Sequence, residues 1–404
     1  MRIAQIAPLW ELVPPTTYGG TELVVHNLTE GLVQRGHEVT LFAAEGSKTA
    51  AKLHPCAPAS LRSMEAQRNK DKTHCTVMGY ELMMLETVFE QADRFDVIHN
   101  HIGFQALPFA NFVDTPTVTT LHNALNPEII RELFEKNAHQ PYISISNYQR
   151  QLWPKLNYVA TIYHGIQMSR FKPSLDYNNK DYLAFLGRLS PEKGPHLAIQ
   201  AAKALGYRLI LAGKVDRVDQ EFYREQVEPL IDGVQIRYIG EVDHERKNEL
   251  LSGAMATLCP VLWPEPFGLV MIESMACGTP VFALRDGSVP EVVEHGRTGY
   301  VAESVEELTE AVRDWKAYNR QIIRKVAEER FSAARMVDDH LKLYRSLLDG
   351  TPVETLTPGR IAEIHHAKVQ PNQIEPMPSQ TFEFTVLEKG HSQSMPIQGY
   401  SYGQ

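Results

Sequence analysis

Short apolar runs rich in β-branched residues alternate with stretches of helical periodicity along most of the chain. In the first half, the runs that predict strands are Arg2–Ala7, Glu38–Ala43, Asp96–Asn100, Thr117–Leu121, Tyr142–Ser146 and Val159–Tyr163. The corresponding runs of the second half are Tyr182–Leu186, Arg208–Ala212, Gln235–Ile239, Ala256–Pro260, Pro280–Leu284 and Gly299–Val301. Since this alternation is typical of parallel sheets joined by helices, we expect an α/β fold of two Rossmann-like domains that face a central cleft.

A polar, turn-rich segment, Phe171–Lys180, separates the two series of runs. Such a composition is typical of a linker. We therefore expect one Rossmann-like domain over residues 1–170 and another over 171–348, whose last helix could pack back on the first domain. Residues 349–404 lose the helical period and carry many prolines and glutamines. They predict a tail of unknown role, with one strand at Thr381–Leu387.

The length and composition bound the class of protein. With 404 residues, of which 43% are hydrophobic and 22% charged, the chain can bury two sizeable cores. The net charge of −9 disfavours a general nucleic-acid-binding protein. The N-terminal apolar run is broken at Pro8 and lacks the core of a signal peptide, and no run of 18 apolar residues occurs. We expect a soluble, cytoplasmic protein.

The four cysteines, Cys56, Cys75, Cys259 and Cys277, are scattered without Cys-x-x-Cys spacing. This pattern fits free thiols in a reducing compartment and predicts neither zinc nor disulfides. The stretch from Glu45 to His74 is locally basic and could touch anionic lipid. No clean apolar face accompanies its charge, so we favour a solvated loop over peripheral membrane contact.

Two adjacent glycines, Gly19 and Gly20, precede a predicted helix that closes at Gly36. Glycines at such a place let backbone N–H groups approach a ligand closely. The segment is not a Gly-x-Gly-x-x-Gly fingerprint, which disfavours a dinucleotide cofactor. By itself the pair fits a tight turn as well as a phosphate contact.

Arg188 and Lys193 follow the first predicted strand of the second half and precede a helix. An arginine can fork onto two phosphate oxygens, and a lysine five residues later adds a point charge, which suits a diphosphate at a strand's carboxyl end. The alternative is surface charge beside a helix cap at Ser190 and Pro191. We favour ligation.

Glu265 and Glu273 are eight residues apart, which predicts similar faces of one helix with Glu265 at its start. Free N–H groups there can meet a phosphate or a sugar hydroxyl. Glu273 lies inside the apolar run Leu269–Ala276, where a buried carboxylate needs a partner. We therefore favour sugar recognition over two solvated helix carboxylates.

Taken together, these segments resemble the family-4 retaining glycosyltransferases of GT-B fold. Three segments carry most of the resemblance: Gly-Gly-x-Glu, Gly-Arg-Leu-x-Pro-Glu-Lys-Gly and Glu-x7-Glu with an internal Phe-Gly-Leu. In chain order, all the matching segments begin at Gly19, Asp96, Thr120, Gly187, Glu265 and Gly287. The resemblance covers about residues 1–348 and excludes the tail.

The resemblance implies that the chain moves a hexose from a nucleotide diphosphate sugar onto an acceptor hydroxyl with retention of configuration. Glu265 would hold hydroxyls of the donor sugar, and Glu273 would hold the ribose. Arg188 and Lys193 would neutralise the diphosphate. The further donor contacts that the resemblance implies are the N–H groups of Phe267, Gly268 and Leu269, and the close approach of Gly19 and Gly20.

From the first domain, the resemblance implies that His122 faces the reacting sugar and that His101 lines the acceptor side. An isolated histidine on a strand is more often a satisfied core residue, but these two follow neighbouring predicted strands. We favour a functional role for His122 and leave His101 open. One departure is Gln167, where the family usually has an aspartate, so a hinge or ribose contact of that acid is not expected.

Cleavage of a glycosyl–phosphate bond builds negative charge on the departing diphosphate. No Asp-x-Asp triplet occurs in the chain. We therefore expect Arg188 and Lys193 to stabilise that charge without a metal or other cofactor. Because no carboxylate stands out as a nucleophile, front-face attack assisted by the leaving phosphate is the working hypothesis.

The donor is expected to be UDP-glucose, with GDP-mannose second. The acceptor stays open between a small molecule, a glycan and a lipid-linked sugar. Two other classes remain as alternatives: a GT-B sugar-nucleotide epimerase, and a catalytically inactive protein that binds a sugar nucleotide.

Overall fold

A computed structural model describes residues 1–16, 18–66, 73–123, 127–178 and 180–351 of the chain. These described residues belong to one compact unit. The strand predicted at Thr381–Leu387, and all but the first residues of the predicted tail, lie outside the described residues.

The first half of the chain forms a seven-stranded parallel sheet with the order β3-β2-β1-β4-β5-β6-β7. In chain order its strands are β1 (Arg2–Ile6), β2 (Glu38–Ala44), β3 (Lys52–Ala57), β4 (Val97–Asn100), β5 (Thr117–Thr120), β6 (Tyr142–Ser144) and β7 (Tyr158–Thr161). Apart from Arg2, the residues of β1, β4 and β5 are buried, because helices cover both faces of a parallel sheet. All six strands predicted for this half are confirmed, with ends that differ by at most two residues.

The stretch from Glu45 to His74 is not a solvated loop, and that prediction is wrong. It contains β3, α2 (Leu61–Ala66) and the beginning of α3 (Thr73–Glu90), while residues 67–72 lie outside the description. β3 pairs with β2 alone and includes His54 and Pro55. An edge strand tolerates a proline and polar residues, so it lacks the apolar signature of a central strand.

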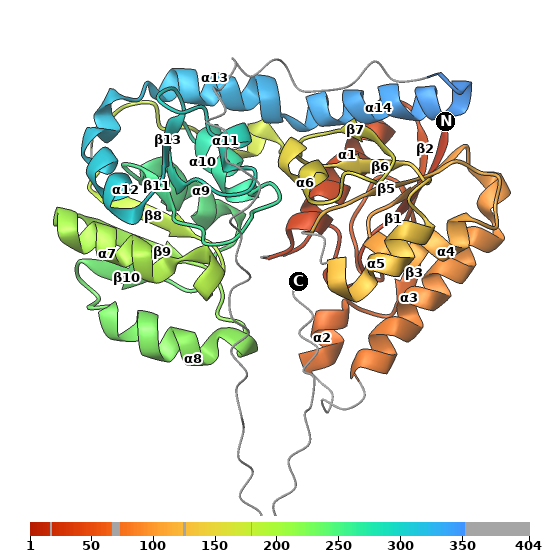
Figure 1. Ribbon diagram of the computed structural model, residues 1–404, viewed down its shortest axis with the longest axis horizontal. Helices are drawn as coiled ribbons and strands as arrows, with labels where there is room; N and C mark the ends of the chain where they lie inside the picture. The colour runs from red at the N-terminus through yellow and green to blue at the C-terminus, as the bar shows by residue number, and fades with distance from the viewer. Residues whose placement is uncertain (17, 67–72, 124–126, 179, 352–404) are drawn as a thin grey trace, which may run out of the picture. The chain divides into compact units, whose positions relative to one another are not determined.

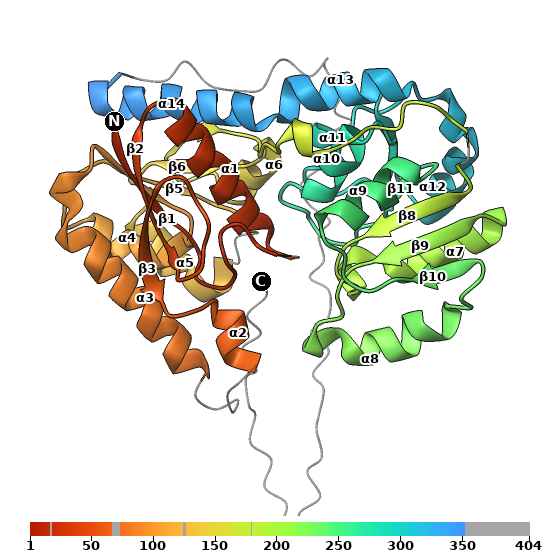
Figure 2. The ribbon, with the colours of Figure 1, turned by 180° about the vertical axis from the view of Figure 1, so that it is seen from behind.

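The second half forms a six-stranded parallel sheet with the order β10-β9-β8-β11-β12-β13. Its strands are β8 (Tyr182–Leu186), β9 (Arg208–Ala212), β10 (Ile236–Tyr238), β11 (Thr257–Cys259), β12 (Val281–Leu284) and β13 (Gly299–Ala302). All six were predicted, with ends that differ by at most one residue. The two sheets, each with helices on its faces (Figure 1, Figure 2), confirm the GT-B α/β fold.

The helices that follow the strands carry the amphipathic periods of the sequence. Those of the first half, besides α2 and α3, are α1 (Gly20–Gln34), α4 (Leu107–Ala110), α5 (Pro127–Lys136) and α6 (Asn147–Leu152). Those of the second half are α7 (Pro195–Leu205), α8 (Gln220–Phe222), α9 (His244–Gly253), α10 (Leu269–Ala276), α11 (Val289–Val292), α12 (Val305–Ala311), α13 (Arg320–Phe331) and α14 (Ala333–Asp349). Among the described residues, no helix is long and apolar enough to cross a bilayer.

The last two helices belong to different cores. α13 packs on α10 beside the second sheet, whereas α14 packs on α1 beside the first (Figure 1, Figure 2). Met336, Val337 and Leu341 of α14 are buried in one cluster with Ile3 of β1 and Leu28 of α1. The C-terminal end of the described chain therefore stabilises the N-terminal sheet by apolar burial.

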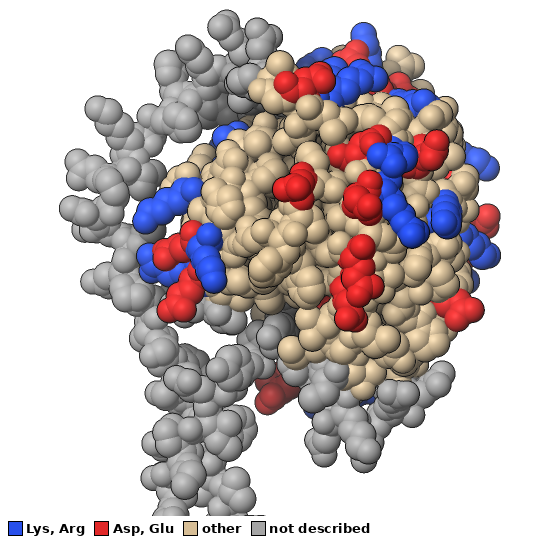
Figure 3. All heavy atoms as spheres, turned by 90° about the vertical axis from the view of Figure 1, so that its right-hand side faces the viewer, with Lys and Arg blue, Asp and Glu red and all other residues tan. Residues whose placement is uncertain are grey.

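The outer face of the first domain carries charges of both signs side by side (Figure 3). The fields of neighbouring opposite charges largely cancel at a distance. Dissolved salt screens what remains beyond about 10 Å. This face thus resembles an ordinary solvated surface.

Candidate functional site

The loop after β8 holds the two predicted cations at the carboxyl end of a buried strand. A short 3-10 helix, Pro191–Lys193, ends at Gly194, whose φ of 68° is left-handed. A Cβ at Gly194 would lie 2.1 Å from the carbonyl oxygen of Pro260 at the end of β11. Only glycine fits this close approach, so the loop is fixed against the neighbouring strand and starts α7 at Pro195.

Arg188 lies among three carboxylates. It forms an ion pair with Glu192, and its guanidinium nitrogens lie 3.5 Å from Asp219 Oδ2 and 3.7 Å from Asp216 Oδ2. Its side chain is largely buried. Burial raises the pKa of Asp219, and the arginine opposes that shift. The guanidinium is thus surrounded by carboxylates in this structure.

Lys193 is in direct contact with Glu265. The lysine Nζ forms an ion pair with Glu265 Oε2, and the Trp263 indole Nε1 donates a hydrogen bond to the same oxygen at 3.0 Å. The Nζ also lies 5.2 Å from the centre of the Trp263 ring, a cation–π distance. Two residues predicted independently for donor binding therefore meet, and the Trp263 contact was missed by the sequence analysis.

Glu265 does not lie on a helix, so the prediction that it shares a helical face with Glu273 is wrong. It precedes α10, which begins at Leu269 after Gly268 with a φ of 81°. A residue in this left-handed conformation cannot belong to a right-handed helix, so α10 starts only after Gly268. The amide of Ser288 donates to the carbonyl oxygen of Glu265 at 2.8 Å. The segment at Gly287 therefore holds the Glu265 backbone in place.

Glu273 is buried in α10, as predicted, and its partner is Lys247 of α9. The lysine Nζ contacts the Glu273 carboxylate and lies 6.0 Å from the Phe171 ring. The ion pair satisfies the buried charge. No spacing in the sequence pointed to Lys247, because it lies on a separate helix 26 residues earlier.

The glycine pair of the first domain meets α10 of the second. A Cβ on Gly20 would lie 3.1 Å from Leu269 Cδ1, and one on Gly19 would lie 2.8 Å from Pro15 Cβ. The ring of Tyr18 lies 4.1 Å from the Nζ of Lys214, which follows β9. The turn before α1 thus lies against the second domain at the beginning of α10.

His122 and His101 contact each other at the carboxyl ends of β5 and β4. His101 Nδ1 lies 2.8 Å from His122 Nε2, and the His122 ring stacks on His164 with centroids 5.1 Å apart. His164 in turn packs edge-on against Phe267 at 5.0 Å. Burial lowers the pKa of His122 to about 3 and holds those of His101 and His164 well below the usual range. These imidazoles are therefore neutral at physiological pH.

The structure brings most of the predicted residues into three contacts: Lys193 with Glu265, Gly20 with Leu269, and His122 with Phe267 through His164. Arg188 is placed at the same strand end but contacts its own three acids, and Glu273 contacts Lys247. The sequence analysis did not single out His164. Its place directly after a strand is the signal that could have identified it.

The residues described include no group of three or more His, Cys, Asp or Glu side chains suited to a metal ion. Cys56, Cys259 and Cys277 are free thiols, as predicted, and burial raises the pKa of each to about 12. The side chain of Cys75 lies outside the description.

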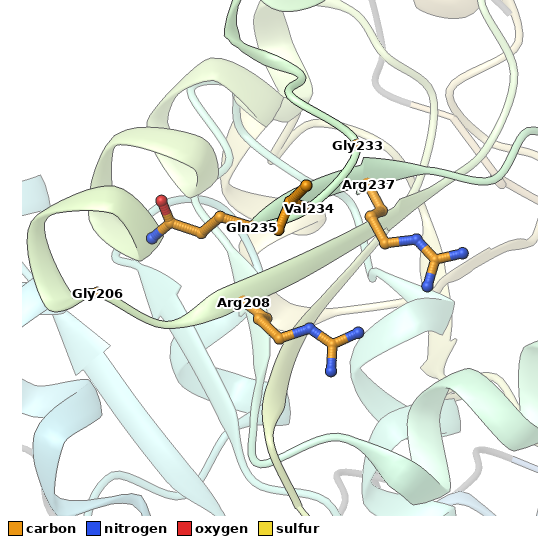
Figure 4. Close-up of a pocket in the computed structure, with 6 residues that line it drawn as sticks. All are labelled: Gly206, Arg208, Gly233, Val234, Gln235 and Arg237. Atoms are coloured by element: carbon orange, nitrogen blue, oxygen red, sulfur yellow. The ribbon is translucent and has the colours of Figure 1, made fainter.

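A separate hollow of about 610 Å³ lies at the edge of the second sheet and holds none of the predicted residues (Figure 4). Its lining residues are Gly206, Arg208, Gly233, Val234, Gln235 and Arg237. Arg208 and Arg237 extend from β9 and β10 in a similar direction, and Arg208 pairs with Asp181. This hollow is therefore distinct from the residues around Lys193 and Glu265.

Models of known protein families match both halves of the chain. A sequence model described as "Glycosyltransferase Family 4" matches residues 18–170, and one described as "Glycosyl transferases group 1" matches residues 168–330. Together they span more than three quarters of the chain. A glycogen synthase of Mycobacterium tuberculosis is 27% identical, with 74% of this chain and 81% of the relative covered.

Two solved structures share the fold over nearly their whole length. AviGT4, a glycosyltransferase involved in avilamycin A biosynthesis, has 28% identity and a TM-score of 0.65, with 87% of this chain and 99% of that chain covered. HepE of Anabaena, in complex with UDP-glucose, has 20% identity and a TM-score of 0.64, with 86% of this chain and 100% of that chain covered.

Proposed function

We propose that this chain, which belongs to the family-4 glycosyltransferases of GT-B fold, moves a hexose from a nucleotide diphosphate sugar onto an acceptor hydroxyl with retention of configuration. The observation that carries the proposal is the contact of Lys193 with Glu265 beside Arg188. It joins a cation suited to a phosphate and a carboxylate suited to sugar hydroxyls at the carboxyl end of one sheet, where ligands of open α/β folds bind.

The proposed task of Arg188 and Lys193 is to neutralise the diphosphate. Each cation has a carboxylate partner in the donor-free fold, Glu192 for the arginine and Glu265 for the lysine. A diphosphate carries more negative charge than one carboxylate, so it competes for both cations. Charge that develops on the leaving group then strengthens these contacts in the transition state.

We propose that Glu265, once released from Lys193, accepts hydrogen bonds from hydroxyls of the donor sugar. The N–H groups of Phe267 and Gly268, which precede α10, and of Leu269, which begins it, add donors for a phosphate in this proposal. Gly19 and Gly20 approach the same group from the first domain.

The Glu273–Lys247 pair offers a place for the ribose, whose hydroxyls can donate to the carboxylate. His122 faces the reacting sugar in this proposal, and His101 supports it from the acceptor side. The proposed division of labour gives residues 171–348 the donor and residues 1–170 the acceptor.

UDP-glucose is the first donor proposed and GDP-mannose the second. The complex of the fold neighbour HepE with UDP-glucose supports that order. The two fixed cations would replace a divalent metal at the diphosphate, because they lie where the leaving charge forms.

The test is a transfer assay with UDP-glucose, GDP-mannose and ADP-glucose as donors and with glucan, inositol and lipid-linked sugars as acceptors. Each reaction is repeated in excess EDTA.

Glu265→Ala should lower turnover at least about tenfold, because loss of a charged hydrogen bond costs about 1.5–3 kcal/mol. Binding of the free nucleoside diphosphate should not weaken, because Glu265 competes with the diphosphate for Lys193. The matched control is Glu294→Ala, since Glu294 is also ion-paired but lies with Arg297 and Arg330.

Wild-type turnover in Glu265→Ala would contradict the sugar-binding role. An isomeric sugar nucleotide formed from donor alone would identify an epimerase. Donor binding without transfer or hydrolysis for any acceptor would identify an inactive binding protein. Activity abolished by EDTA and restored by magnesium would contradict the metal-free mechanism.

A further inference from the structure

A buried hydrogen-bonded network connects His122 to the C-terminal helix. His99 and His101 of the β4 end lie with ring centroids 3.9 Å apart, and His340 of α14 lies 5.3 Å from His99. Tyr344 of α14 contacts His99 and Gln5, a residue of β1. Gln5 and Tyr344 both lie outside residues 18–330, to which the family sequence models correspond.

Gln5 fixes the direction of the hydrogen bonds. Its Nε2 donates to the Tyr344 hydroxyl at 3.3 Å, which turns its Oε1 toward His101 Nε2 at 2.7 Å. A carboxamide oxygen can only accept, so the proton of His101 must lie on Nε2.

The proton of His122 follows from that of His101. A neutral imidazole has one N–H, so His101 Nδ1 can only accept. The contact of 2.8 Å to His122 Nε2 then requires that His122 Nε2 is the donor. His122 Nδ1 is left without a proton, and it is a buried atom with no hydrogen-bond partner among the described residues.

Tyr344 completes the network consistently. Its hydroxyl accepts from Gln5 and donates to His99 Nδ1 at 2.6 Å. His99 Nε2 then donates to the Thr120 hydroxyl at 2.7 Å. If the Gln5 amide were reversed, each of these bonds would reverse as well, and the proton of His122 would move to Nδ1. His122 Nδ1 would then be a buried N–H with no acceptor among the described residues. Because a buried N–H without a partner is rare and costly, the network favours the first arrangement.

We propose that Gln5 and Tyr344 are positioning residues that hold the proton of His122 on Nε2 through His101, leaving His122 Nδ1 as a hydrogen-bond acceptor for a substrate hydroxyl. The tautomer follows from the network alone. The meaning for catalysis rests on the proposed function, in which His122 faces the reacting sugar. Burial, which holds the pKa of His99 well below its usual range as well, keeps the network neutral.

The experiment compares Tyr344→Phe with wild type by long-range proton–nitrogen correlation spectra of the full chain with ring-labelled histidine. The His122 signal is assigned with His122→Gln. Wild type should show His122 protonated on Nε2, and Tyr344→Phe should show a mixture of both tautomers. Turnover should fall about two- to tenfold, in proportion to the lost population, while the KM for the donor changes less.

Tyr142→Phe is the matched control, because Tyr142 is also a fully buried tyrosine of the first domain and its hydroxyl donates to the Asn137 carbonyl at 2.9 Å. It should match the stability loss of Tyr344→Phe without any change at His122. Gln5→Leu should reproduce the mixture if Tyr344→Phe fails to fold.

A wild-type His122 protonated on Nδ1, or an unchanged tautomer in both variants, would overturn the inference whatever the activity. Full turnover of His122→Gln would instead refute the catalytic role of His122. The spectra would still decide whether Gln5 and Tyr344 set its tautomer, so the two failures are distinguishable.

Discussion

Glu22 places a carboxyl group in a buried position in the first turn of α1. Its Oε1 accepts a hydrogen bond of 3.3 Å from the Glu11 amide. Burial is the main cause that raises its pKa to about 7, and the Glu11 carboxylate adds to the shift. Because the unfolded carboxyl ionises near its ordinary value of about 4.3, the folded state holds this proton more tightly between the two values.

Glu22→Gln should therefore be more stable than wild type at about pH 8 and nearly equal at about pH 5. The sign follows from linkage: a raised carboxyl pKa means that stability falls as the pH rises from 4.5 to 7. The difference between variant and wild type should reach the order of 3 kcal/mol. Urea unfolding at both pH values measures it. A difference that is the same at both would show that Glu22 ionises normally.

The individual residues of the site could be predicted where one segment contains the signal. Lys193 and Arg188 follow an apolar strand and precede a helix, and their place at the strand end is confirmed. Lys247, the partner of Glu273, could not be predicted, because an ion pair between two helices does not alter the hydrophobic periodicity of either helix. Gln5 was hidden for a similar reason: in the sequence it is a single polar residue inside a strand.

The packing of α14 on α1 depends on the absence of a side chain at Gly31. A Cβ there would lie 2.4 Å from Val337 Cγ2 of α14. A side-chain carbon cannot approach that closely, so the two helices would have to separate. The missing side chain at Gly31 therefore allows the close approach of α14 to α1. Forcing extra atoms into such a contact typically costs 1–3 kcal/mol.

Gly31→Ala should destabilise the chain by about 1–3 kcal/mol, whereas the same change in a Val337→Ala background should be neutral or stabilising. Gly79→Ala is the control, because Gly79 lies in α3 with no described atom within 4 Å of an added Cβ. It should gain up to about 1 kcal/mol from helix propensity. Chemical denaturation of the four variants completes a double-mutant cycle. Equal effects of Gly31→Ala in both backgrounds would contradict the contact.

Glu291 of α11 joins the two domains through the beginning of α6. Its two carboxylate oxygens accept from the amides of Asn147 at 2.7 Å and Tyr148 at 2.6 Å, and the Tyr163 hydroxyl donates to it at 2.8 Å. The carboxylate thus satisfies two N–H groups that a helix start leaves free.

Glu291→Gln should lose about 1–3 kcal/mol of stability, because an amide NH2 cannot accept at the second backbone N–H. Glu303→Gln is the control, since Glu303 is exposed and pairs with Arg285. Thermal unfolding of both variants against wild type measures the loss. Equal unfolding temperatures for both would show that the Glu291 bridge contributes nothing.

Among the secondary-structure elements, the central strands were predicted well, because strands that are buried on both faces are rich in apolar and β-branched residues. β3 was missed because an edge strand needs no such run. The beginning of α10 was placed too early, because the eight-residue spacing gave no weight to Gly268, whose left-handed conformation delays the helix to Leu269. Hydrophobic periodicity predicts which face of a helix is buried, whereas residues such as glycine determine where the helix begins and ends.

At the scale of the whole molecule, α14 brings the chain back from the second sheet to the first. Histidines are buried where α14 packs on the first domain. His340 of α14 lies beside His99 and is nearly inaccessible to solvent. Burial lowers its pKa to about 4, and the neighbouring Arg335 acts in the same direction. The unfolded chain binds this proton near pH 6.5, so the docking of α14 favours the neutral form.

His340→Leu should therefore resist acid better than wild type. A depressed histidine pKa means that stability is lost as the pH falls from about 6.5 toward 4, since the unfolded state takes up the proton first. At about pH 4.5 the variant should be more stable than wild type by about 2–3 kcal/mol relative to their difference at about pH 7.5. Glu22 changes stability in the opposite direction over part of this range, so the comparison must be made between variant and wild type at each pH. His139→Leu, at an exposed position, serves as the control for the replacement of an imidazole by a leucine side chain. If His340→Leu behaves like His139→Leu, the imidazole of His340 is not what makes the docking of α14 sensitive to acid.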